Sequence, residues 1–131
     1  MLPAKKRRDG AMLLVVGGLG AGKREFVKRE FGYSDADIAV GMLDSRPVIS
    51  DVQELLRTGD IDNERLFSAL VLKDVVICNE VGCGVVPLDP AERAWRDAVG
   101  RLSVRLAARA DKVVRVCCGL PAVIKDSCLC K

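Results

Sequence analysis

The chain has 131 residues, half of them apolar, and it contains no histidine. This length is enough for one domain with a substantial core and too short for two. Without histidine there is no imidazole base, no Ser-His-Asp triad and no histidine-ligated zinc site. The net charge of +3 arises within residues 5–9, and aromatic residues make up only 4% of the chain. This composition argues against a nucleic-acid-binding protein.

Residues 1–10 are predicted to form a basic, flexible leader, either a solvated tail or an arm that binds a charged surface. The apolar run Ala11–Val16 is too short for a signal peptide or a membrane span. We therefore predict a cytoplasmic protein with no membrane span, in which the six cysteines are thiols. One domain is expected over residues 11–125, followed by a cysteine-containing tail over residues 126–131.

The first half of the chain contains strand and helix signals separated by glycines. Met12–Val16 is continuously apolar, which is typical of a parallel strand covered on both faces. A helix is predicted over Lys23–Phe31 and a short strand over Ile38–Val40. Ser50–Gln53 has the pattern of a capping box and is predicted to open a short helix that ends near Arg57.

The second half continues the alternation, with a helix over Asn63–Leu72 and a buried strand over Val75–Cys78. Asp89 followed by proline predicts the start of a helix that runs to about Ala110. Val113–Cys118 is predicted to be a final buried strand, which gives the order β-α-β-α-α-β-α-β. The long helix has an apolar stripe made of Ala91, Ala94, Trp95, Ala98, Leu102, Leu106 and Ala110.

The cysteines do not form a metal-binding motif, since no C-x-x-C occurs. Cys78, Cys117 and Cys118 lie in predicted strands and are expected to be core thiols. Cys128 and Cys130 lie in the predicted exposed tail, where opportunistic binding of a metal or of a cobalt corrinoid is the alternative to a tail without a ligand.

Residues 17–24 fit the phosphate-loop pattern G-x-x-x-x-G-K, with arginine where serine or threonine usually follows the lysine. Glycines let backbone N–H groups converge on phosphate oxygens, and the lysine reaches the β- and γ-phosphates. The absent hydroxyl normally holds Mg²⁺, so phosphoryl transfer is less well supported than phosphate binding. A tight strand-to-helix connection is the alternative. The predicted nucleotide-binding residues are Gly17, Gly18, Leu19, Gly20, Ala21, Gly22, Lys23 and Arg24.

Asn79 and Glu80 follow the strand Val75–Cys78, at the sheet edge where ligands of α/β proteins bind. Glu80 can hold Mg²⁺, directly or through water, or orient a hydroxyl group for attack. The equally weighted alternative is that both residues only stabilise the loop before Pro87.

Three segments together resemble a known family. They are Asn79–Pro87, matching N-E-V-G-x-G-x-V-P, Arg93–Arg101, matching an aromatic-R-D-x-x-G-R stretch, and Leu106–Ala107. This combination resembles the adenosylcobinamide kinase / adenosylcobinamide-phosphate guanylyltransferase family of cobalamin biosynthesis. The glycine loop is similar to that family's G-G-x-R-S-G-K-S, and Asp44–Pro47 is similar to a segment that ends in Arg-Pro.

The resemblance implies a P-loop NTPase-like (RecA-like) α/β fold, a mostly parallel sheet flanked by helices, in a reduced size. It implies a homo-oligomer, usually a trimer, that uses Mg²⁺ with ATP or GTP to phosphorylate the corrinoid adenosylcobinamide. It further implies GMP transfer through a guanylylated histidine. Within this family pattern, Lys23 and Glu80 are the candidate catalytic residues, Glu80 is the candidate metal ligand, and Arg46 is a candidate nucleotide contact.

The chain departs from the family pattern at positions that carry chemistry. The guanylylated histidine would fall near Gly41, the loop hydroxyl is replaced by Arg24, and Ser103-Val104 replaces an Asn-Gln pair. A middle strand that ends in an acidic residue is predicted to be deleted. We therefore expect slow kinase turnover or none and no GMP transfer through histidine. The alternatives are a catalytically silent nucleotide-binding or scaffold protein and an unrelated small P-loop protein.

Overall fold

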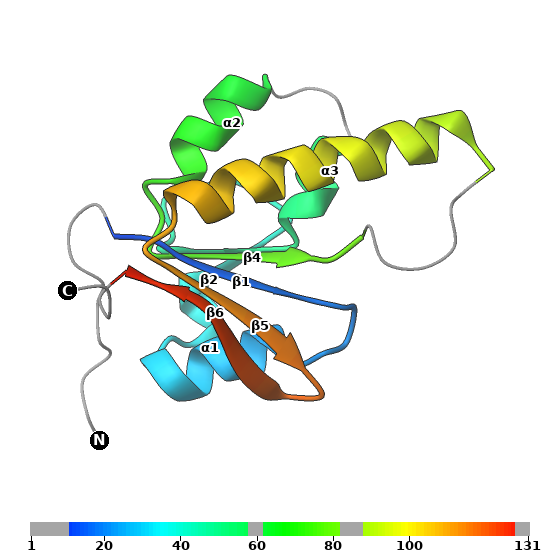
Figure 1. The fold of residues 1–131 in the computed structure, drawn as a ribbon. Coiled ribbons are helices and arrows are strands. Elements are labelled where there is room, and N and C mark those ends of the chain that lie inside the picture. The colour runs from blue at the N-terminus through cyan, green and yellow to red at the C-terminus, as the bar shows by residue number, and fades with distance from the viewer. Residues whose placement is uncertain (1–10, 58–61, 82–87, 128–131) are drawn as a thin grey trace.

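The computed structural model describes residues 11–57, 62–81 and 88–127, which form a six-stranded sheet flanked by helices (Figure 1). The strand order is β2-β3-β4-β1-β5-β6. The strands are β1 (Leu13–Gly17), β2 (Ile38–Val40), β3 (Val48–Ser50), β4 (Val75–Asn79), β5 (Lys112–Cys117) and β6 (Leu120–Asp126). The helices are α1 (Lys23–Phe31), α2 (Asn63–Leu70) and α3 (Pro90–Arg109), with 3₁₀ helices η1 (Asp35–Asp37) and η2 (Val52–Leu56).

Strand β1 lies inside the sheet because its apolar run lets both faces be covered. It pairs in parallel with β4 on one side and with β5 on the other. Strands β2, β3 and β4 continue the parallel pairing, whereas β6 is an antiparallel edge strand that pairs with β5. The predicted mostly parallel α/β fold is therefore confirmed.

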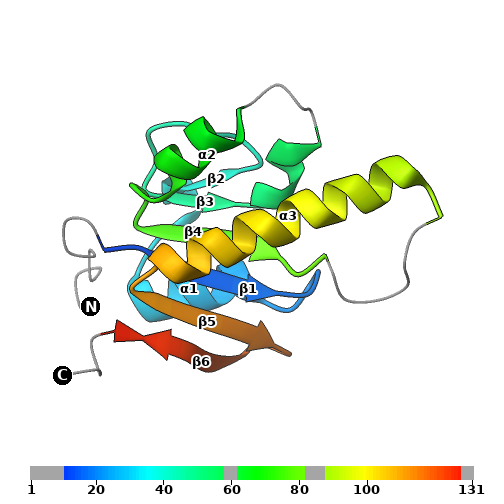
Figure 2. The ribbon, with the colours of Figure 1, turned by 45° about the horizontal axis from the view of Figure 1, so that its top comes forward.

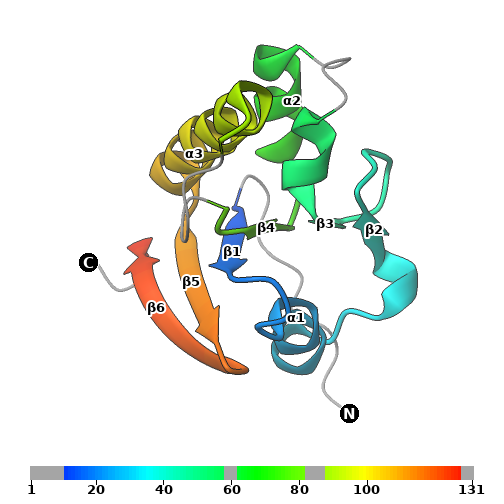
Figure 3. The ribbon, with the colours of Figure 1, turned by 90° about the vertical axis from the view of Figure 1, so that its right-hand side faces the viewer.

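The helices divide the core into two layers, one on each face of the sheet (Figures 2 and 3). Helix α1 covers one face, where Phe26 and Val27 pack against Leu13 and Val15 of β1. Helices α2, α3 and η2 cover the other face, with Leu66, Leu102 and Leu106 among the buried side chains. Strand β1 thus contributes alternate residues to both layers.

Helix α3 begins as predicted. The Asp89 carboxylate accepts a hydrogen bond from the N–H of Ala91 (2.9 Å), and Pro90 occupies the first turn. The helix ends at Arg109 with Ala110 as its C-cap. The predicted apolar stripe is correct near this end, but Ala91 and Ala94 are exposed.

The predicted capping box at Ser50–Gln53 is wrong. Ser50 ends strand β3, Asp51 adopts a left-handed conformation (φ 57°), and no side chain caps η2. Gln53 instead directs its side-chain oxygen to the N–H of Asn79 on β4. A tertiary hydrogen bond therefore takes the place of the predicted local one.

Two strands were not predicted. Strand β3 is buried but only three residues long, and the capping-box pattern assigned its last residue, Ser50, to a helix start. Strand β6 is mostly exposed and therefore lacks the buried apolar run that identified β1. The predicted leader, Cys128, Cys130 and residues 82–87 of the family-like segment lie outside the described residues. No helix in the described ranges combines the length and apolar character needed to cross a membrane.

Truncating a buried side chain of α3 tests the assignment of its core face. Leu106 is fully buried, so Leu106→Ala is expected to lower the free energy of unfolding by about 2–5 kcal/mol. Val104 on the same helix is 71% exposed, and Val104→Ala is expected to change this free energy by about 0.5 kcal/mol or less. Urea denaturation followed by circular dichroism measures both. Equal effects of the two substitutions would contradict the packing of α3.

Candidate functional site

The glycine loop connects the end of β1 to the start of α1, as the pattern predicts. Gly22 has a φ of +94°, which L-residues rarely adopt, and it is the N-cap of α1. A Cβ atom on Gly17 would lie 2.5 Å from the carbonyl oxygen of Val116, so β5 approaches the loop too closely for any side chain there. Glycine at these two positions is therefore required by the backbone path itself.

Lys23 is the first residue of α1, and its side chain is buried beside the loop. Its ammonium group donates a hydrogen bond to the carbonyl oxygen of Gly18 (2.7 Å). Burial lowers the pKa of Lys23, and the negative charge of Asp51 opposes this shift. Lys23 is therefore a buried cation, and the negative charge with the largest effect on its pKa is that of Asp51, which directly follows β3.

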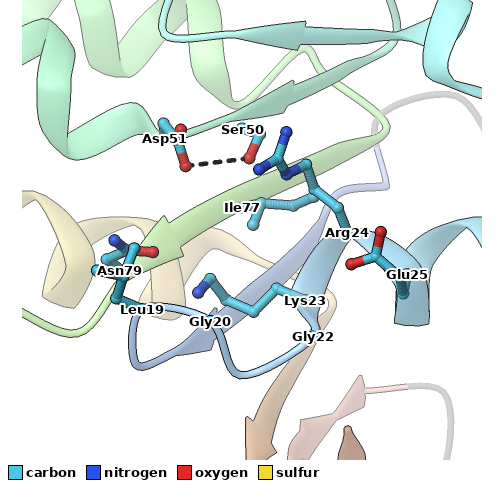
Figure 4. Close-up of a pocket in the computed structure, with 10 residues that line it drawn as sticks. All are labelled: Leu19, Gly20, Gly22, Lys23, Arg24, Glu25, Ser50, Asp51, Ile77 and Asn79. Carbon is cyan, nitrogen blue, oxygen red and sulfur yellow. Dashed lines mark hydrogen bonds between the residues drawn. The ribbon is translucent and has the colours of Figure 1, made fainter.

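A pocket of about 110 Å³ lies between the loop and the ends of β3 and β4 (Figure 4). The loop and α1 form one wall, which includes Gly20, Lys23 and Arg24. The opposite wall is formed by Ser50, Asp51, Ile77 and Asn79, and the Ser50 hydroxyl lies 3.3 Å from the Asp51 carboxylate. The predicted loop residues Leu19, Gly20, Gly22, Lys23 and Arg24 are thus brought together around one pocket.

Asp51 is the acidic residue that prediction from sequence missed. The predicted deletion of the family's middle strand, which ends in an acidic residue, stays a prediction. Strand β3 pairs with β4 and leads directly into Asp51 on the pocket wall. The apolar residues before an acid, Val48-Ile49-Ser50-Asp51, were the available signal, but the capping-box pattern had already assigned Ser50 and Asp51 to a helix start.

Glu80 does not line this pocket. Its N–H donates to the carbonyl oxygen of Gly17 (2.9 Å), and its carboxylate accepts a hydrogen bond from Nε of Arg115 on β5 (2.8 Å). Its side chain borders a second, mostly apolar cavity of about 400 Å³ between α3 and the sheet. Asn79 borders both cavities. The structure therefore places Asp51, and not Glu80, on the wall of the pocket that contains Lys23, although the negative charge of Glu80 also acts on Lys23.

Arg46 lies at the opposite edge of the sheet from the loop. Its guanidinium donates to the carbonyl oxygen of Ile38, the first residue of β2 (3.2 Å), and pairs with Asp44 (2.6 Å). Strands β2 and β3 are parallel, so the connection between them returns to the end of the sheet at which both strands begin. Arg46 lies in this connection, whereas the pocket lies at the end of the sheet at which β3 and β4 finish. The structure does not bring this predicted nucleotide contact to the site.

The turn between β5 and β6 supports the loop from outside. The N–H of Gly119 donates to the carbonyl oxygen of Ala21 (2.8 Å), and a Cβ on Gly22 would lie 3.3 Å from the Cα of Gly119. Cys117 and Cys118 at this turn are exposed, so the prediction that they are core thiols is wrong, whereas Cys78 is buried as predicted. Cys117 is the last residue of β5 and Cys118 lies in the turn to β6, so both come after the buried residues of β5.

The fold and the loop define an α/β protein of the P-loop type. Residues 53–124, more than half of the chain, match the family described as cobinamide kinase / cobinamide phosphate guanyltransferase, and the chain belongs to this family. It is 47% identical over 53 residues to the bifunctional adenosylcobalamin biosynthesis protein CobU of Salmonella typhimurium, and 43% identical over 53 residues to that of Escherichia coli K12. Each match covers 40% of this chain and 29% of the relative.

The buried thiol of Cys78 predicts a pH dependence of stability. Burial raises the pKa of Cys78 to about 11, although a hydrogen bond with Ser103 acts in the other direction. Because the folded state holds this proton more tightly than the unfolded chain does, its contribution is complete below pH 9 and is lost as the pH rises to about 11. The loss should reach about 2–3 kcal/mol.

Urea denaturation between pH 8 and pH 11 measures this loss, with Cys78→Ala as the control. The substitution lowers stability at every pH by leaving a cavity, but it removes the thiol. The difference between wild type and variant should therefore shrink as the pH rises. A difference that stays constant would contradict the raised pKa of Cys78.

Proposed function

We propose that this chain binds a nucleoside triphosphate at the glycine loop and uses it to phosphorylate adenosylcobinamide. The observation that carries the proposal is the position of Lys23, buried in the loop and facing Asp51 across the pocket. The family supplies the acceptor, and the two named relatives are bifunctional adenosylcobalamin biosynthesis proteins. The chain matches only part of those relatives, so activity and acceptor are both proposed here.

The loop has the two features that phosphate binding requires. Backbone N–H groups at the start of α1 and the partial positive charge of the helix N-terminus favour an anion. The ammonium of Lys23 is anchored at the Gly18 carbonyl, at the base of the same loop. We propose that it shifts from this carbonyl to the β- and γ-phosphate oxygens when a triphosphate binds.

The opposite wall offers oxygen ligands that suit Mg²⁺, namely the Asp51 carboxylate and the Ser50 hydroxyl. No group of three or more acidic, cysteine or histidine side chains is poised to hold a metal in the ranges 11–57, 62–81 and 88–127. Mg²⁺ would therefore enter with the triphosphate, whose oxygens complete its ligand set. When bound, the ion neutralises charge that develops on the transferred phosphoryl group.

In the proposed reaction, the acceptor hydroxyl oxygen bonds to the γ-phosphorus while the bond from that phosphorus to the bridging oxygen breaks. The nucleoside diphosphate leaves with the electron pair of that bond, and the hydroxyl proton is released to solvent. Lys23 holds the phosphates, and the chain's own acid facing it is Asp51. GMP transfer through a histidine is not part of the proposal, because the chain contains no histidine. A cytoplasmic homo-oligomer, such as a trimer, remains the proposed form of the protein.

A second candidate function is nucleotide binding without catalysis. It is favoured by Arg24, which occupies the position of the usual loop hydroxyl and is exposed beside the pocket. An arginine contributes positive charge but cannot ligate Mg²⁺. Turnover of adenosylcobinamide separates the two functions.

Titration calorimetry with ATP and with GTP tests the phosphate site. Lys23→Ala is expected to weaken binding about 10-fold or more, because it removes a charge-assisted hydrogen-bond donor. Lys28→Ala is the matched control, since Lys28 lies on the same helix but pairs with Asp35 and Glu25. If neither triphosphate binds the wild type at millimolar concentration, the proposed function is refuted.

A comparison of the two acids tests the role of Asp51. Asp51→Asn is expected to lower Mg²⁺-dependent phosphorylation of adenosylcobinamide by about 10-fold or more, and to leave metal-free nucleotide binding unchanged or stronger. Glu80→Gln is the control, because Glu80 pairs with Arg115 and borders the other cavity. A larger loss in Glu80→Gln would reverse the assignment. A wild type that binds nucleotide without turnover would support the silent function.

A further inference from the structure

Gln53 connects two parts of the pocket wall to helix α3. Its side-chain oxygen accepts a hydrogen bond from the N–H of Asn79 (3.1 Å), and its backbone carbonyl accepts one from Nε1 of Trp95 (2.8 Å). Gln53 is 3% exposed, so its side-chain amide is buried in the protein interior. Buried hydrogen bonds of this kind hold their partners in one arrangement because leaving either group unpaired is costly.

Trp95 is itself held in place by a charged neighbour. The guanidinium of Arg57 lies 3.6 Å from the centroid of the Trp95 ring, a cation–π arrangement. The same guanidinium forms ion pairs with Glu92 on α3 (2.7 Å) and with Glu54 on η2 (3.2 Å). The contacts of Arg57 therefore hold α3 against η2, the 3₁₀ helix that directly follows Asp51.

Three polar residues, Ser50, Asp51 and Asn79, line the pocket wall that faces the loop. The inference concerns Asp51 and Asn79. Asp51 lies two residues before Gln53 in a left-handed conformation that favours glycine, and Asn79 is hydrogen-bonded to Gln53. Such a backbone conformation persists where its surroundings enforce it. Gln53 and Trp95 are therefore placed to fix Asp51 relative to Asn79.

We propose that Gln53 and Trp95 are positioning residues that hold the Asp51 wall of the pocket at a fixed separation from Asn79 and Lys23. This inference rests on the proposed nucleotide site. The positioning residues touch neither the loop nor the triphosphate, and they act through Asp51. Their loss should therefore affect the binding of Mg²⁺ with nucleotide more than the binding of nucleotide alone.

The fold contains a second cation–π contact that serves as a control. Arg105 of α3 lies 4.1 Å from the centroid of the Phe67 ring on α2 and pairs with Glu64 (2.7 Å). This contact also fastens α3 to its neighbour, but none of its three residues lines the pocket. Disturbing it changes stability without changing the Asp51 wall.

The test measures dissociation constants of the full chain by calorimetry, with Mg²⁺ and with EDTA, for the triphosphate that the wild type binds more tightly. Trp95→Phe removes the N–H that donates to the backbone carbonyl of Gln53. Gln53→Met keeps a side chain of similar size but removes the oxygen that accepts from the N–H of Asn79. Each is expected to weaken Mg²⁺–nucleotide binding about 2- to 10-fold and to change metal-free binding less than 2-fold. Gln53→Glu, which keeps an acceptor oxygen, should restore part of the loss, and Phe67→Leu should lower the melting temperature only.

Several outcomes would overturn the inference while leaving the nucleotide site intact. These are unchanged Mg²⁺–nucleotide binding in both Trp95→Phe and Gln53→Met, equal losses with and without Mg²⁺, or the same selective loss in Phe67→Leu. If Trp95→Phe does not fold, Gln53→Met decides alone. A wild type that binds no triphosphate refutes the proposed function instead, so the two failures are distinguishable.

Discussion

The structure depends on the parallel pairing of β1 with a partner on each side. This pairing places Gly17 opposite Asn79 of β4, and it brings Val116 of β5 against the same glycine. The start of the loop is thus enclosed by backbone on both sides, and the N–H of Glu80 closes it further through the Gly17 carbonyl. Because the register is set by buried apolar side chains, the hydrophobic core determines the position of the polar site.

The two opposite charges at the pocket come from separate elements of the fold. The cation Lys23 comes from α1, and the acid Asp51 comes from the end of β3. Burying an ammonium group is costly, and a facing carboxylate reduces that cost. The position of Lys23 relative to Asp51 therefore depends on how the strands of the sheet pair. It depends also on the contacts of Trp95 in α3 with Gln53 and Arg57 at η2.

Local signals predicted the parts of the fold that local interactions build. The run Met12–Val16, the glycine-rich connection from this strand to a helix, and the Asp89-Pro90 helix start all have strong patterns, and the structure confirms these elements. Strand β3 was not predicted, because the capping-box pattern assigned its end to a helix start. The role of Gln53 was not predicted, because its partner Asn79 lies 26 residues away. Arg46 was assigned by family resemblance alone, and the return path of the β2–β3 connection decides its position. Tertiary contacts of this kind leave no local pattern.

The central place of β1 has a consequence for how the protein is made. Its two partners begin at Val75 and Lys112, so β1 stays unpaired until segments about 60 and 100 residues further along the chain have been synthesised. Parallel pairing at such sequence separation is slow, because long loops must close first. During synthesis the loop and its lysine therefore exist without the backbone that shapes them. The pocket beside Lys23 is therefore expected to form only after both partner strands of β1 have been synthesised.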